Sequence, residues 1–163
     1  MKTSTKRLAL LSVTVAIAMI LSFIESRLPN PIPIPGIKLG LANVAVVFAL
    51  YKLGTWQAVV VSFVRVALSA ILFGSTLSLL YSLAGALLSF GIMLLAKKVF
   101  KLHTVGVSVL GGVLHNAGQI AVASVIMETA VIIYYMPWLI ISGTLAGIAI
   151  GLCAYQLIKR IKI

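Results

Sequence analysis

The sequence predicts an all-α integral membrane protein, a bundle of six transmembrane helices with both termini in the cytoplasm. Hydrophobic residues make up 62% of the chain and charged residues only 9%, whereas soluble domains contain about 25% charged residues. Apolar runs close to the length of about 20 residues that a bilayer-crossing helix needs recur along the whole chain. Basic residues flank these runs, as membrane orientation requires, so the net charge of +11 does not indicate nucleic-acid binding. We expect a single transmembrane domain over residues 1–163.

The first three spans are expected at residues 8–24, 38–53 and 56–73. The first follows basic residues, as in a signal peptide, but no small-x-small cleavage site follows it, so we expect a retained helix. Proline at every second position of the loop at 30–36 prevents a helix and favours an extended path. Gly54-Thr55 separates the second span from the third.

The last three spans are expected at residues 77–96, 104–127 and 137–158. Gly74-Ser-Thr forms the turn before the fourth span, and a basic connector at 97–103 leads to the fifth. Residues 129–137 are interpreted as a loop or a short interfacial segment.

Positive charge gives the orientation, because loops rich in Lys and Arg stay in the cytoplasm. Six spans with an internal amino terminus place both glutamates outside. The same arrangement places ten of the thirteen basic residues inside: Lys2, Lys6, Arg7, Lys52, Lys97, Lys98, Lys101, Lys159, Arg160 and Lys162.

Arg65 is expected within the third span, where an unpaired charge is costly. It lies eight residues before the end of that span, about 12 Å deep at 1.5 Å per residue. Two interpretations remain open. Arg65 forms a structural ion pair with Glu25 or Glu128, or it contacts an anionic or polar ligand.

Further polar residues are expected near the same depth. His115 and Gln119 share one face of the fifth helix, and Asn116 pairs with Gln119 at i, i+3. Asn43 lies on the second span and Lys38 at its outer end. Because polar groups inside membranes normally face a bundle interior or a cavity, these residues predict a ligand pocket that opens outward. The alternative for His115 is a satisfied core residue.

Small residues mark helix contacts. Gly143, Gly147 and Gly151 form a double GxxxG pattern, which permits close helix approach and predicts packing within the chain rather than dimerisation. Ser12 and Ala16 form a weaker small-xxx-small pair that is expected to dock a partner helix.

No catalytic or metal site is expected. A Walker GxxxxGK[ST] sequence is missing, and two distant glutamates cannot build the acidic magnesium site that diphosphate chemistry uses. Cys153 is the single cysteine, so neither an intrachain disulfide nor a cysteine metal cluster can form. We expect a protein that is not an enzyme.

Several motifs resemble one bacterial family. They are the segment at 35–43, Arg65, the segment at 81–85 and His115-Asn-Ala-Gly-Gln119. Nearly the whole chain resembles the Gx transporter family, also catalogued as heptaprenyl diphosphate synthase component I, which is similar to the S components of energy-coupling factor (ECF) transporters. The resemblance implies six helices, an outward pocket, a membrane coupling subunit, cytoplasmic ATPases and a location in the bacterial cytoplasmic membrane.

The resemblance also gives two functional expectations. Association of the family with flavin-dependent extracellular electron transfer implies a flavin or quinone-related cargo, bound as a transported ligand and not as a cofactor. We therefore expect a transport subunit whose ligand contacts are Lys38, Asn43, Arg65, His115, Asn116 and Gln119, with the loop at 28–37 as a lid. The synthase name implies the alternative, a non-catalytic membrane accessory of heptaprenyl diphosphate synthesis. A scaffold without a ligand is a third reading.

Overall fold

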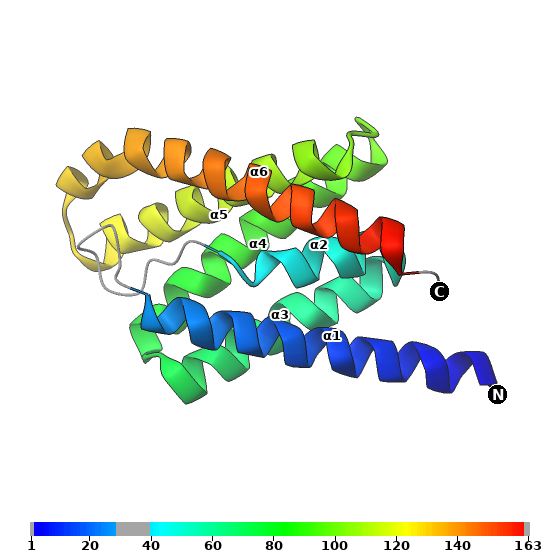
Figure 1. Cartoon of the computed structure of the whole chain (residues 1–163). Helices are drawn as coiled ribbons and strands as arrows, with labels where there is room; N and C mark the ends of the chain where they lie inside the picture. Colours follow the sequence, from blue (N-terminus) through cyan, green and yellow to red (C-terminus); the bar gives the residue numbers. More distant parts are fainter. Residues whose placement is uncertain (1, 29–39, 162–163) are drawn as a thin grey trace.

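The computed structural model of the chain describes residues 2–28 and 40–161 (Figure 1). These residues form six α-helices and one short 3₁₀ helix, with no strand among them. The elements are α1 (Lys2–Arg27), α2 (Asn43–Lys52), α3 (Thr55–Phe73), α4 (Thr76–Lys98), α5 (Thr104–Ile126), η1 (Ala130–Tyr135) and α6 (Met136–Arg160). The all-α prediction is confirmed.

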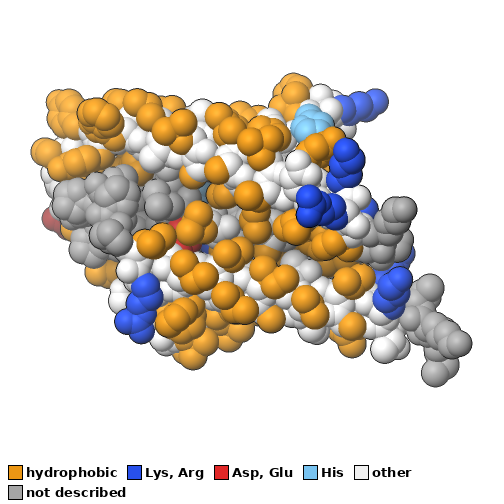
Figure 2. Space-filling model, in the orientation of Figure 1, with side chains coloured by type: hydrophobic (Ala, Val, Ile, Leu, Met, Phe, Trp, Pro, Cys, Tyr) orange, Lys and Arg blue, Asp and Glu red, His pale blue; other side chains and the backbone are white. Residues whose placement is uncertain are grey.

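Five of the described helices are long and apolar enough to cross a membrane, so the chain is a multi-pass membrane protein. Their outward side chains are largely aliphatic and aromatic, and Figure 2 shows these apolar side chains spread over the visible face. The remaining helix, α2, has only 10 residues. It is about 15 Å long at 1.5 Å per residue, whereas the hydrocarbon core of a bilayer is about 30 Å thick. Residues 38 and 39 of the expected second span lie outside the described residues. The six-span topology therefore stays a prediction.

The short helix α2 lies inside the bundle. Among the described elements it contacts α1, α3, α5 and α6, and seven of its residues are buried. Two hydrogen bonds tie its carboxyl end to other segments: Lys97 Nζ of α4 donates to the Leu50 carbonyl, and Tyr51 Oη of α2 donates to the Leu102 carbonyl. Gly54 then turns the chain into α3 with a φ of 126°, which a residue with a Cβ rarely adopts.

Helix α5 packs closely between α4 and α6, and glycines determine how close these helices come. A Cβ added to Gly147 on α6 would lie 2.6 Å from the Cα of Val109, and one added to Gly112 on α5 would lie 2.6 Å from the carbonyl oxygen of Gly143. On the other side, a Cβ on Gly118 would lie 2.8 Å from the Ala84 carbonyl of α4. The GxxxG pattern is thus used for packing within the chain, as predicted.

The amino-terminal end of α1, the carboxyl-terminal end of α6 and the connector between α4 and α5 lie at one end of the bundle, on the right in Figure 1. Most of the visible Lys and Arg side chains gather there in Figure 2. The opposite end holds the turn between α3 and α4 and the η1 segment (Figure 1). This grouping fits the charge asymmetry that predicts the basic end to be cytoplasmic.

The first prediction concerns the membrane orientation of the basic end. Single cysteines are introduced as Lys98→Cys or Ile34→Cys in a Cys153→Ser background, which removes the exposed native thiol. In intact cells a membrane-impermeant maleimide should label position 34 and leave position 98 unlabelled until the membrane is permeabilised. Equal labelling of both positions from outside would show that the six-span arrangement is wrong.

The second prediction concerns the contact between α5 and α6. Gly147→Ala should lower the free energy of unfolding by about 1–3 kcal/mol because the added methyl group overpacks the helix contact. Gly91→Ala is the matched control, since nothing lies within 4 Å of a Cβ at Gly91. The control should be neutral or stabilise by up to about 1 kcal/mol through helix propensity. Thermal unfolding of both variants in detergent measures the difference, and equal melting temperatures would contradict the packing account.

Candidate functional site

Arg65 lies inside the bundle, on the face of α3 that meets α2. Only 4% of its surface is exposed. Its Nη2 donates a hydrogen bond of 3.2 Å to Oδ1 of Asn43, the first residue of α2. Among the described residues its Nε has no hydrogen-bond partner. The described protein groups therefore leave part of this cation unsatisfied.

The pairing of Arg65 with Asn43 follows from the helical hairpin formed by α2 and α3. Both residues stand eleven positions from Gly54, one before it and one after it. Two antiparallel helices rise equally from their shared turn, so the two side chains reach the same depth. The sequence spacing therefore predicts that Asn43 and Arg65 lie at the same depth, although it does not predict which faces of the two helices meet.

Glu25 adds a negative charge near this pair. It lies in the last turns of α1, is 6% exposed, and accepts a hydrogen bond from the backbone N–H of Gly40 through Oε1. Its carboxylate attracts the Arg65 guanidinium electrostatically. The sequence placed Glu25 in an outer loop, but the structure buries it against the chain that leads into α2. Glu128, the other predicted partner, is exposed on the turn after α5.

The predicted site residues of α5 are all buried. His115 packs against Gly85 of α4, where an added Cβ would lie 2.7 Å from the His115 carbonyl oxygen. Asn116 Nδ2 donates a hydrogen bond of 2.9 Å to the Leu139 carbonyl of α6. Gln119 is 0% exposed, and neither of its amide atoms has a hydrogen-bond partner within the described parts of the chain.

Only some of the predicted site residues contact one another directly. Arg65 and Asn43 are joined directly, whereas Asn116 is joined to the backbone of α6. Gln119 lies seven residues before the end of α5 and Arg65 eight before the end of α3, about 10 and 12 Å from the same end of the bundle. Lys38 and all but the first residue of the predicted lid at 28–37 lie outside the described residues.

Helix α4 contributes polar residues that the sequence interpretation missed. Ser78, Ser82 and Ser89 are buried, and with Gly85 they recur at intervals of four, three and four residues. That spacing lines one face of a helix, so the signal was present in the sequence. The Oγ of Ser89 has no hydrogen-bond partner among the described residues.

The predicted docking pair lies on the outside of α1. Ser12 and Ala16 are both exposed, and Ser12 Oγ donates to the Leu8 carbonyl of its own helix at 3.1 Å. The face is therefore available to another helix in the membrane.

The buried groups can exchange hydrogen bonds with a polar molecule. A guanidinium, three side-chain amides and several hydroxyls offer hydrogen bonds and one positive charge. The described residues contain no cluster of three or more His, Cys, Asp or Glu for a metal ion. Together, the fold and these groups define a multi-pass helical membrane protein with a polar interior.

Residues 14–157 match the heptaprenyl diphosphate synthase component I family, and the chain belongs to that family. Neither a curated protein nor a solved structure matches the chain.

Proposed function

We propose that the chain binds a small anionic molecule inside its helix bundle and acts as the substrate-binding subunit of an ECF-like transporter. The observation that carries this proposal is the buried guanidinium of Arg65, whose Nε has no partner among the described residues. An unpaired charge within a membrane is costly, and Asn43 supplies no charge to neutralise it.

An anionic ligand satisfies Arg65 better than the described protein groups do. Glu25 attracts Arg65 but also accepts the Gly40 N–H, so this carboxylate is shared. A ligand carboxylate or phosphate can take two parallel hydrogen bonds from arginine. Gln119, at a similar depth on α5, is a second group that a polar ligand would satisfy, because a fully buried amide without partners costs about 1–3 kcal/mol. A flavin or quinone-related compound with an anionic group is the cargo class we favour.

Active transport by this chain would require partner subunits. The proposed partners are a membrane coupling subunit and cytoplasmic ATPases, since the sequence contains no Walker motif. The exposed face of α1 at Ser12 and Ala16 is the proposed docking surface for the coupling subunit, because small side chains permit close helix approach. The proposed location is the bacterial cytoplasmic membrane.

The family assignment favours a second candidate, a non-catalytic membrane accessory of heptaprenyl diphosphate synthesis. A prenyl diphosphate also carries an anionic group that Arg65 would bind. Deletion of the chain separates the two functions: the accessory role predicts loss of prenyl synthase activity with normal uptake, and the transport role predicts the reverse.

The third prediction tests the ligand site. Mass spectrometry of the detergent-purified chain should identify a copurified small molecule with a carboxylate or phosphate. Arg65→Lys keeps the charge but loses the forked geometry, and Arg65→Ala loses both. We expect ligand affinity to fall about tenfold or more in each variant, since hydrogen bonds to charged groups contribute about 1.5–3 kcal/mol. Lys98→Ala, at an exposed position near the end of α4, is the control and should bind normally.

A structural role for Arg65 gives a different result. In that case Arg65→Ala would aggregate, and Glu25→Gln in the same chain would restore a single species in size-exclusion chromatography. That rescue, together with the absence of any copurified anion from the native protein, would overturn the proposed function.

A further inference from the structure

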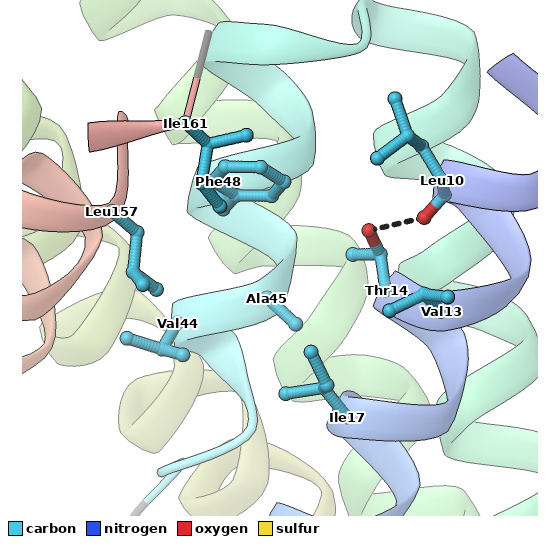
Figure 3. A pocket seen from close by; sticks show the side chains of 9 residues that line it. All are labelled: Leu10, Val13, Thr14, Ile17, Val44, Ala45, Phe48, Leu157 and Ile161. Carbon is cyan, nitrogen blue, oxygen red and sulfur yellow. Dashed lines mark hydrogen bonds between the residues drawn. The ribbon is translucent and has the colours of Figure 1, made fainter. Parts of the chain in front are cut away.

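An apolar groove runs along the outside of the bundle between α1 and α6, with α2 as its floor (Figure 3). Among the described residues, α1 and α6 each contact α2 but not each other. The groove has a volume of about 100 Å³ and is lined by Leu10, Val13 and Ile17 of α1, by Phe48 of α2 and by Leu157 of α6, among others. Its single hydroxyl, on Thr14, is used within α1 by a hydrogen bond of 2.7 Å to the Leu10 carbonyl. The groove therefore offers hydrocarbon contacts and no free polar group.

Basic residues stand where the groove reaches the basic end of the bundle. Arg7 lies three residues before Leu10, and Lys52 lies four residues after Phe48. Each is therefore about one helical turn away from a residue that lines the groove. Arg160 borders a shallow hollow that shares Leu157 with the groove. Each of the three helices thus carries a basic residue within about one helical turn of a residue that lines the groove.

We propose that this groove is a binding site for an anionic phospholipid. One acyl chain lies in the groove, and the phosphate is held by Arg7, Lys52 and Arg160. Cationic residues at the cytoplasmic membrane surface attract anionic headgroups, and the apolar lining matches a hydrocarbon tail. The combination of an apolar lining with basic residues at one end favours a lipid over a protein partner, because a phospholipid carries both a hydrocarbon tail and an anionic headgroup.

This site is separate from the proposed docking surface. The groove uses Leu10, Val13 and Ile17 of α1, whereas Ser12 and Ala16 lie on another side of the helix, since each residue advances by about 100°. Lipid binding and partner docking would therefore occupy different faces of α1.

The fourth prediction tests the lipid site by native mass spectrometry of the purified chain with added phosphatidylglycerol or phosphatidylcholine. Phosphatidylglycerol should bind tighter by about tenfold or more, since the basic residues beside the groove attract its anionic headgroup. The double variant Arg7→Gln, Arg160→Gln should lose most of this preference. The control variant, Lys98→Gln with Lys101→Gln, removes two charges at the same end of the bundle but away from the groove. It should keep the preference for phosphatidylglycerol.

A second variant tests the acyl-chain contact independently of charge. Val13→Trp fills the groove from an exposed position and should reduce binding of both lipids, whereas Ile71→Trp, exposed on α3, should not. Three results would overturn the proposal: equal affinity for the two lipids, equal loss in the two charge variants, or a copurified membrane protein that Val13→Trp displaces.

Discussion

A positive charge inside the membrane constrains much of this structure. The guanidinium of Arg65 is 4% exposed, and its environment must offset the cost of removing it from water. The fold offsets part of that cost by placing the amino-terminal end of α2 in the interior of the bundle. Asn43, the first residue of α2, accepts one hydrogen bond from Arg65. Glu25 of α1 accepts a hydrogen bond from the backbone N–H of Gly40, in the segment that leads into α2. Three helices are thus positioned around a single cation, and its Nε has no hydrogen-bond partner among the described residues.

The remaining helices keep this interior in place through close packing. Because membranes provide little hydrophobic driving force between helices, small residues that allow backbone approach supply much of the association. Glycines of α5 and α6 let these helices meet, and Gly85 of α4 leaves room for His115. The tight contacts of α4, α5 and α6 contrast with the looser attachment of α1, whose span-length segment is the least buried of the five. A partner subunit and lipids would reach the protein most easily along α1.

Much of this arrangement was present in the sequence, and the reasons for the exceptions are physical. Hydropathy and Gly or Pro breaks predict α3, α4, α5 and α6 closely, whereas α1 begins earlier and ends later than its predicted span. Equal spacing about Gly54 brings Asn43 to Arg65. The short length of α2 was missed because a buried helix is apolar whether or not it spans the bilayer. The burial of Glu25 was also missed, since its partner Gly40 lies in a connection whose path depends on tertiary contacts. The serine stripe on α4 could have been found from its helical spacing alone.

The central claim is that a ligand anion, and not the protein alone, completes the environment of Arg65. An experimental structure of the native chain, purified without stripping bound molecules, tests this claim most directly. The account predicts non-protein density with a carboxylate or phosphate within hydrogen-bonding distance of Arg65 Nε and near the amide of Gln119. A structure in which Glu25 forms a closed bidentate pair with Arg65, with no additional density beside it, would contradict the account.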